Sequence, residues 1–251
     1  MTAIDWRAVQ ARLGAMGYDP GPSDGAPGMT DPGRATDVKT VRALLSLAAN
    51  RDVGEFGVRV APVLVAMLHK YGLLASAERL AQFLATTAHE TGGYTAFSEN
   101  LYYTTPSRLV ANWPSRFNLA SALLYLRNPR KLAERVYSYE ARHGTPGDLG
   151  NRKGTDDAYA MRGGGWIQTT GYSNYLRAQQ VTGLPLVEHP ELLHDPLTSI
   201  EAACAYWAGV GCNALADADP TGRRSRLKVN GGTIGMADVL ARTARMMKVL
   251  V

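Results

Sequence analysis

Residues 76–93 read SAERLAQFLATTAHETGG, a stretch with a helical pattern and an abrupt end. Its apolar positions follow the i, i+3, i+4, i+7, i+8 spacing of one helix face, and they are Leu80, Phe83, Leu84, Thr87 and Ala88. Ser76 is a suitable N-cap because its hydroxyl can accept a backbone N–H. Gly92-Gly93 ends the pattern, since glycine leaves the helical conformation easily. We therefore expect an amphipathic core helix here.

Outward from this helix, the same periodicity recurs along most of the chain. Further helices are expected near residues 60–71, 116–127, 129–141, 174–182, 198–209 and 237–249. Strand patterns are weak and predict at most a short hairpin near residues 159–170. The expected fold class is therefore mainly all-α, with residues 51–58 as a short connector.

Composition excludes several classes of protein. The chain has 251 residues, 45% hydrophobic and 20% charged, which is ordinary for a globular protein and excludes one that is mostly disordered. Its most apolar stretch is broken by His69-Lys70, so no stable membrane insertion is expected. The first residues lack the apolar segment of a secretory signal, so we expect cytoplasmic synthesis without a signal peptide. Cys204 and Cys212 are too few for a disulfide framework and are expected to be small buried side chains.

The first 50 residues differ from the rest in charge. They hold five basic and five acidic side chains, so the net charge of +5 lies entirely in residues 51–251. Helices are expected over residues 6–16 and 36–49, with a turn-rich loop between them. We expect a small helical domain over residues 1–52 and a large one over residues 58–251.

Two glutamates flank the glycine break. Glu90 lies seven residues after Phe83 and shares the apolar face, where burial would raise the pKa of its carboxyl group and suit it to act as a general acid. In one unbroken helix Glu99 would lie on the opposite side, but Gly92-Gly93 allows the chain to turn back. Two carboxyl groups about 6.5–9.5 Å apart leave room for the water of an inverting glycosidase, with Glu99 as general base. The spacing alone also fits two unrelated solvated glutamates.

A second stretch, residues 161–175, is rich in glycine and then in amides, hydroxyls and aromatic rings. Glycines allow the backbone to approach a ligand, amides and hydroxyls bind sugar hydroxyl groups, and aromatic faces cover sugar rings. The stretch lacks the pattern of a phosphate-binding loop. Together with Asn230, in an Asn-Gly-Gly turn, it predicts a carbohydrate site.

These segments together resemble the family-19 glycoside hydrolases, and most of all their phage endolysin branch, whose plant relatives are chitinases. The resemblance rests on His-Glu-Thr-Gly-Gly at 89–93, Ser-Glu-Asn-Leu-Tyr-Tyr at 98–103, Arg-Gly-Gly-Gly-Trp-Ile-Gln-Thr-Thr at 162–170 and Asn-Gly-Gly at 230–232. It covers roughly residues 58–251 and implies a lysozyme-like helical catalytic domain with a central substrate cleft.

The resemblance also implies roles for single residues. Glu90 is the expected general acid, Glu99 the carboxylate that activates a water, and Thr170 a hydroxyl that helps to hold that water. Gln168, Asn174 and Asn230 match sugar-binding positions of the family, and the expected substrate-binding residues also include Arg162 and Tyr102. Tyr102 is included from its residue type and not from the resemblance, because an aromatic ring could line a cleft, although aromatic residues on helices often lie in the core instead. Arg162 is included because the family often has Gly-Arg-Gly where this chain has Gly163-Gly164-Gly165, so a neighbouring arginine could replace the missing contact.

The N-terminal segment resembles the small helical peptidoglycan-binding domains that are often fused to cell-wall hydrolases. The match rests on Val9-Gln10, Leu13, residues 17–21 and Asp24-Gly25, while residues 27–33 depart from the pattern. This resemblance favours the cell wall over chitin as the target.

The expected function is hydrolysis of β-1,4 glycosidic bonds in the glycan strands of peptidoglycan. We expect a monomer that uses no metal or organic cofactor, binds no nucleic acid, and reaches the wall of the host cell through a membrane pore made by another protein. A chitinase, a lytic transglycosylase and a non-catalytic wall-binding protein are the alternatives.

The sequence also contains patterns of other chemistries. His89-Glu90 is not the motif of a zinc protease, because the second histidine would fall at Gly93. His189 and His194 could serve a zinc amidase, but both lie in proline-rich turns, where surface or capping roles are expected. The basic run 223–228 could bind nucleic acid, although such a run more often forms a solvated helix face.

Overall fold

The computed structural model describes residues 2–25 and 35–251; the segment 27–33, which departs from the binding-domain pattern, lies outside them. The chain divides into two compact units: unit 1 comprises Met1–Ala96 with Pro196–Val251, and unit 2 comprises Phe97–Asp195. More than half of the described residues lie in helices, and isolated bridges occur in place of strands. The expected mainly all-α fold class is confirmed.

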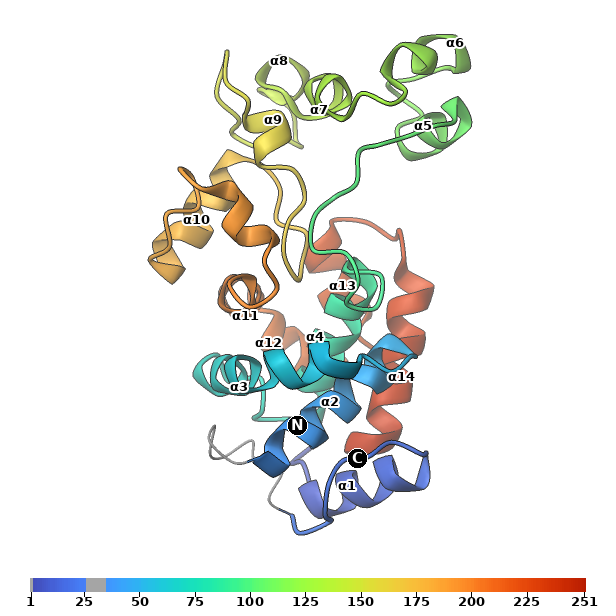
Figure 1. Cartoon of the computed structure of the whole chain (residues 1–251), viewed down its shortest axis with the longest axis vertical. Coiled ribbons are helices and arrows are strands. Elements are labelled where there is room, and N and C mark those ends of the chain that lie inside the picture. The colour runs from blue at the N-terminus through green and yellow to red at the C-terminus, as the bar shows by residue number, and fades with distance from the viewer. Residues whose placement is uncertain (1, 26–34) are drawn as a thin grey trace. The chain divides into compact units, whose positions relative to one another are not determined.

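Helix α4 (Ala77–Glu90) is the central helix of unit 1. The side chain of Ser76 accepts the backbone N–H of Arg79, and nearly every residue from Ala77 to Ala88 is buried. Helices α2 (Ala35–Ala49), α12 (Cys212–Ala218) and α14 (Met236–Leu250) pack against α4 (Figure 1). The expected core helix and its N-cap are confirmed.

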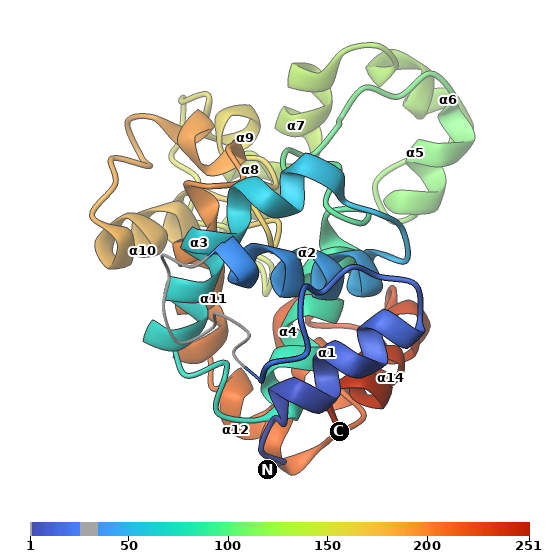
Figure 2. The same ribbon diagram turned by 60° about the horizontal axis from the view of Figure 1, so that its bottom comes forward.

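The N-terminal helices are part of unit 1. Helix α1 (Trp6–Ala15) packs beside α14, where Arg12 donates to the carbonyl of Val249 at 2.9 Å (Figure 2). Helix α2 packs against α3 (Gly54–Lys70) as well as against α4 and α14. The domain boundary between residues 52 and 58 does not coincide with the division into compact units, and it stays a prediction.

The expected connector over residues 51–58 is wrong in its second half, because α3 begins at Gly54. Gly57 lies inside this helix at a close approach to α2. A Cβ atom at Gly57 would lie 2.7 Å from Cγ2 of Val53 and 3.2 Å from Cα of Arg42. Glycine is therefore present here for packing between helices, and its helix-breaking tendency is overridden by burial.

Two further helices complete unit 1. Helix α11 (Ser199–Gly209) packs against α3, and α13 (Arg223–Asn230) packs against α12 and α14. Cys204 and Cys212 are buried and unpaired, as expected.

Unit 2 consists of short helices around a small core. Its elements are α5 (Pro106–Asn112), α6 (Leu119–Ala122), η1 (Leu123–Tyr125), α7 (Pro129–Tyr137), α8 (Tyr139–Arg142), α9 (Asp157–Ala160), α10 (Tyr172–Thr182) and η2 (Pro190–His194). The core residues are Leu101, Leu109, Phe117, Ala122, Leu132, Ala133, Val136 and Ala158. The fold of this unit thus depends on loops that run between short helices.

Two expectations for unit 2 are corrected. The continuous helix over residues 116–127 is wrong, because Asn118 starts a new helix through a capping box with Ser121 and Arg127 has a φ of 57°. The hairpin near residues 159–170 is reduced to isolated antiparallel bridges, in which Gly164 pairs with Ser98 and with Thr169. Glycine-rich backbone forms turns here instead of paired strands.

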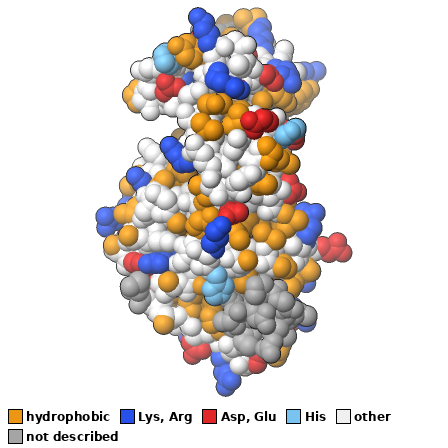
Figure 3. Space-filling model, turned by 90° about the vertical axis from the view of Figure 1, so that its left-hand side faces the viewer, with side chains coloured by type: hydrophobic (Ala, Val, Ile, Leu, Met, Phe, Trp, Pro, Cys, Tyr) orange, Lys and Arg blue, Asp and Glu red, His pale blue; other side chains and the backbone are white. Residues whose placement is uncertain are grey.

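The surface carries charges of both signs. Figure 3 shows basic and acidic side chains among hydrophobic ones on one face. Within residues 2–25 and 35–251, no helix has the length and apolar character needed to cross a membrane.

Candidate active site

Glu90 is the last residue of α4, and it forms an ion pair with Arg226 of α13 in the same unit. The side chain of Arg226 is 2% exposed and that of Glu90 is 17% exposed. A second guanidinium nitrogen of Arg226, Nη2, donates to the carbonyl of Ile234 at 2.7 Å. One buried arginine therefore holds both the carboxylate and the loop that follows α13.

Arg226 is a site residue that sequence reasoning missed. The basic run 223–228 was expected to be a solvated helix face, and Arg223 and Arg224 are indeed exposed. Arg226 is buried because α13 packs against the side of α4, where Ser225 donates to the side chain of Gln82 at 2.7 Å. The available signal was indirect: a glutamate on an apolar helix face requires a partner of opposite charge.

The end of α4 makes further contacts with the first turn of α14 and with the loop that joins α13 to α14. His89 Nδ1 lies 2.7 Å from Oδ2 of Asp238, which also accepts Nε of Arg242 at 2.8 Å. A Cβ atom at Gly235 would lie 2.1 Å from Nε2 of His89, so this position has room only for glycine. Asn230 donates to the carbonyl of Gly232 at 3.3 Å and thus stabilises the loop itself.

Glu99 lies in unit 2 and is held by neutral donors. Its Oε1 accepts the hydroxyl of Tyr137 at 2.8 Å, and its Oε2 accepts the N–H of Gly163 at 3.2 Å. Burial raises the pKa of Glu99, while these two hydrogen bonds and the charge of Arg162 oppose that rise. Glu99 therefore keeps its proton to a higher pH than an exposed glutamate does. Tyr137 is a second residue that sequence reasoning missed, and the local pattern gave no signal for it.

The glycine-rich stretch fixes the backbone around Glu99. Arg162 donates to the carbonyl of Glu99 at 3.2 Å and to Oγ of Ser98 at 2.9 Å. A Cβ atom at Gly164 would lie 2.7 Å from the hydroxyl of Tyr175 and 2.8 Å from Cδ2 of His194. The chain thus has no room for a side chain where the family often has arginine, and Arg162 binds the protein's own backbone and Ser98 from the adjacent position.

The remaining predicted residues of unit 2 lie along the same stretch. A Cβ atom at Gly163 would lie 2.8 Å from Oε1 of Gln168 and 3.3 Å from Cβ of Glu99, so these two side chains converge over Gly163. Thr170 donates to the carbonyl of Gln168 at 2.9 Å, and Asn174 donates to the carbonyl of Thr170 at 2.8 Å. The amide of Gln168 therefore lies close to Glu99, and Thr170 and Asn174 are linked to Gln168 by successive hydrogen bonds to the backbone; amides and hydroxyls are groups that bind sugars.

Tyr102 has an exposed side chain, and its backbone N–H donates to the side chain of Asn100.

The structure divides the other predicted site residues into two groups, and each group is assembled within one unit. Unit 1 brings together Glu90 and Asn230. Unit 2 brings together Glu99, Arg162, Gln168, Thr170 and Asn174.

His189 and His194 each have a local partner. His189 lies 3.2 Å from Glu191, and Nε2 of His194 lies 3.4 Å from the hydroxyl of Tyr175. Burial lowers the pKa of His194 to about 4. Across residues 2–25 and 35–251, no three His, Cys, Asp or Glu side chains are grouped closely enough to hold a metal ion.

Comparison with known proteins agrees with the interpretation of Glu90 and Glu99 as the carboxyl groups of a glycosidase. The chain is 29% identical over 172 residues to a glycosyl hydrolase family 19 domain-containing protein of Haemophilus influenzae, a match that covers 68% of this chain and 79% of that protein. This similarity supports a glycosyl hydrolase of family 19. No family model matches the chain.

Proposed function

We propose that this chain is a glycosidase that hydrolyses the β-1,4 bonds of bacterial peptidoglycan, with residues 1–52 binding the wall. The observation that carries the proposal is the environment of Glu99. A buried carboxyl group with fixed donors, in a loop of amides and hydroxyls, is costly for folding and is typical of an active site. The similarity to a family 19 protein supports the reaction class.

In the proposed reaction Glu90 is the general acid. In this proposal, binding of the sugar separates Glu90 from Arg226, with which it is paired, and leaves the Glu90 carboxyl group facing the glycosidic oxygen. Glu90 then transfers its proton to the glycosidic oxygen as the bond between that oxygen and the anomeric carbon breaks. The leaving sugar departs as an alcohol.

Glu99 is the general base of the same step. It takes a proton from a water whose oxygen attacks the anomeric carbon from the opposite face, so the configuration inverts. Thr170 can accept a hydrogen bond from this water, because its own hydroxyl proton is donated to the carbonyl of Gln168. Glu99 works as a base only while ionised, so activity is lost as the pH falls through its raised pKa.

The charge of the chain supports peptidoglycan over chitin. The net charge is +5, and the stem peptides of peptidoglycan are acidic while chitin is neutral. Attraction between opposite charges increases the local concentration of enzyme on the wall and weakens in salt.

The test compares Glu90→Gln and Glu99→Gln on purified peptidoglycan and on chitin oligosaccharides. We expect each variant to release reducing ends at least about 100-fold more slowly than the wild type. Glu55→Gln in unit 1 and Glu188→Gln in unit 2 are matched controls, because both glutamates are exposed, and they should retain full activity.

Product analysis decides between the alternatives. Mass spectrometry shows new reducing ends after hydrolysis and anhydro ends after transglycosylation, and NMR of fresh products shows whether the configuration inverts. Wild-type wall clearance by Glu90→Gln would refute the acid assignment, and release from chitin alone would refute the substrate.

A further inference from the structure

One segment of unit 2 carries basic residues and no acidic ones. Between Glu99 and Glu134 the sequence contains five basic side chains and no Asp or Glu, and they are Arg108, Arg116, Arg127, Arg130 and Lys131. This segment forms α5, α6, η1 and the start of α7. The charge of this one segment therefore equals the net charge of the whole chain.

The same segment exposes three leucines to solvent. Leu119 and Leu123 are each 60% exposed and Leu124 is 65% exposed. Leu119 and Leu123 are four residues apart, so they lie on one side of α6 and η1. Beneath them Phe117 and Ala122 are buried in the core of unit 2. The exposed leucines therefore alternate in sequence with residues that are anchored in the core. We call residues 106–131 the leucine tip.

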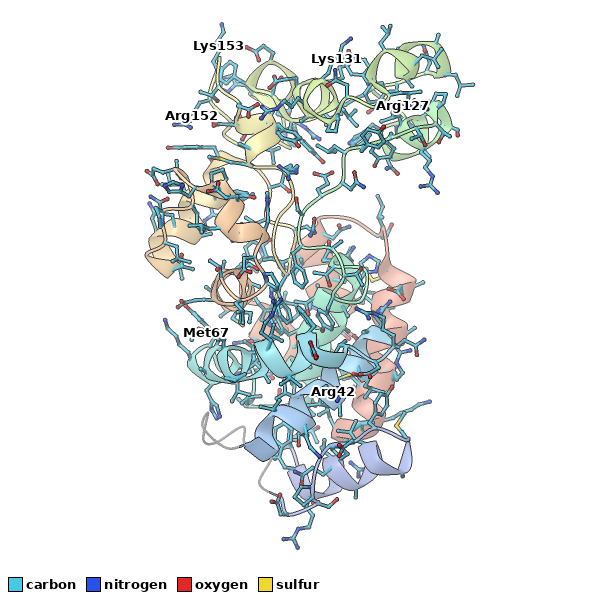
Figure 4. The ribbon with its side chains drawn as sticks, viewed as in Figure 1. Arg42, Met67, Arg127, Lys131, Arg152 and Lys153 are labelled. Atoms are coloured by element: carbon cyan, nitrogen blue, oxygen red, sulfur yellow. The ribbon has the colours of Figure 1, made fainter. Side chains whose placement is uncertain are left out.

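Not all of the cations in the leucine tip are neutralised. Arg130 pairs with Asp156 at 2.5 Å, and Arg116 donates to backbone carbonyls. Arg108, Arg127 and Lys131 are exposed and have no acidic partner among the described residues. Figure 4 labels Arg127 and Lys131 in the part of unit 2 formed by α5–α7. The exposed leucines therefore lie in the same segment as three exposed cations that have no acidic partner among the described residues.

We propose that the leucine tip binds the surface of an anionic phospholipid bilayer. Leu119, Leu123 and Leu124 enter the boundary between headgroups and acyl chains, and the three cations contact lipid phosphates. The contact is interfacial, since the helices of the tip are far too short to cross a bilayer. It does not depend on the proposed glycosidase activity.

Charge and side-chain chemistry favour lipid over other partners. Sugars are bound by aromatic faces and hydrogen-bonding groups, which aliphatic leucines do not provide. A second copy of the chain, docked through the same surface, would bring the cations of both tips together. A nucleic acid would match the charge but would leave the leucines exposed to water.

The test uses sedimentation of the full chain with vesicles of phosphatidylcholine alone or of phosphatidylcholine mixed with an equal part of phosphatidylglycerol. We expect binding only to the mixed vesicles. The variant L119S/L123S/L124S should lose at least about tenfold in affinity. The variant R108Q/R127Q/K131Q should lose on the order of fivefold per charge removed.

Matched controls come from exposed positions of the same unit outside the tip. Val181→Ser and Lys153→Gln remove an exposed apolar side chain and an exposed cation, and both should bind as the wild type does. Figure 4 shows Lys153 in the α8–α9 part of unit 2. Thermal unfolding of all variants verifies that they are folded. We expect them to fold because the substituted side chains are exposed.

Two results would overturn the proposal. The first is unchanged binding of L119S/L123S/L124S to the mixed vesicles. The second is loss of binding to purified peptidoglycan, with vesicle binding intact, in either tip variant. Glu90→Gln should bind vesicles normally, so failure of the lipid proposal and failure of the glycosidase proposal are separate outcomes.

Discussion

Glu90 and Glu99 are nine residues apart in sequence, and their two units hold them by opposite means. In unit 1 a buried guanidinium neutralises the charge of Glu90. In unit 2 a tyrosine hydroxyl and a backbone N–H bind Glu99, and neither donor cancels its charge. A charged partner makes a half-buried carboxylate inexpensive, whereas neutral donors leave part of the cost of burial in place. The same residue type is therefore held by an opposite charge in one unit and by neutral donors in the other.

The largest effect is expected when the charged partner in unit 1 is removed. Arg226→Met leaves Glu90 without its counter-charge and removes the shorter of the hydrogen bonds to the carbonyl of Ile234, so the free energy of unfolding should fall by about 3 kcal/mol. Urea unfolding measures it. Arg224→Met, at an exposed position of the same helix, should change stability by less than about 0.5 kcal/mol. Equal stability of Arg226→Met and wild type would show that the pair contributes nothing.

A steric substitution tests whether unit 2 depends on packing where unit 1 depends on charge. Gly164→Ala places a methyl group against Tyr175 and His194, and overpacking should cost about 1–3 kcal/mol in unfolding free energy. Gly209→Ala is the control, because nothing lies within 4 Å of a Cβ atom there. If both variants have the melting temperature of the wild type, the neighbours of Gly164 can move aside at little cost in stability.

The sharpest contrast comes from the same substitution in both units. Glu99→Gln removes a carboxylate whose folded-state pKa is raised above its unfolded value, so the variant should be more stable by about 1 kcal/mol at pH 7. That gain is complete above the raised pKa and disappears as the pH falls, because wild-type Glu99 then becomes protonated. Glu90→Gln should instead destabilise the chain, since Arg226 loses its counter-charge. Thermal melts at neutral and acidic pH measure the stability of both variants. If Glu99→Gln and Glu90→Gln changed stability in the same direction, the proposed difference between the two units would be wrong.

The smallest effect concerns one hydrogen bond. The hydroxyl of Tyr137 lowers the pKa of Glu99 against the larger influence of burial, so Tyr137→Phe should move the titration of Glu99 to higher pH. Carboxyl-carbon NMR measures the titration, and the acidic limb of the activity profile should move in the same direction. Tyr139→Phe, two residues later, should leave both unchanged. A downward movement would mean that Tyr137 acts on Glu99 by some other route.

Local patterns predicted the parts of the molecule that local forces determine. Helix α4, its Ser76 cap and its glycine end follow from periodicity and backbone chemistry within residues 76–93. The break at Asn118 was missed because apolar spacing continued across it, while a capping box started a new helix. Side-chain hydrogen bonds of this kind compete with helix continuation and leave little trace in hydrophobicity.

The sequence predicted the two glutamates of the site but not the side chains that bind them. Glu90 and Glu99 stand out by type and position, but their partners come from distant segments. Arg226 looks like part of a solvated run until α13 packs on α4, and Tyr137 is one of 12 tyrosines in the chain. Tertiary packing brings Arg226 and Tyr137 to the two glutamates. The local sequence pattern does not indicate which arginine or tyrosine will be placed there.

Glu90 and Arg226 are 136 residues apart, which constrains the order of events during synthesis. Unit 2 is one continuous segment and can fold as soon as residue 195 has emerged from the ribosome. Unit 1 cannot, because α12 and α14, which cover α4, are made after unit 2. The apolar surface of α4 is therefore covered only after α12 and α14 have been made, and contacts of such long sequence separation form slowly. The carboxylate of Glu90 gains its counter-charge only once α13 has been made and has packed beside it.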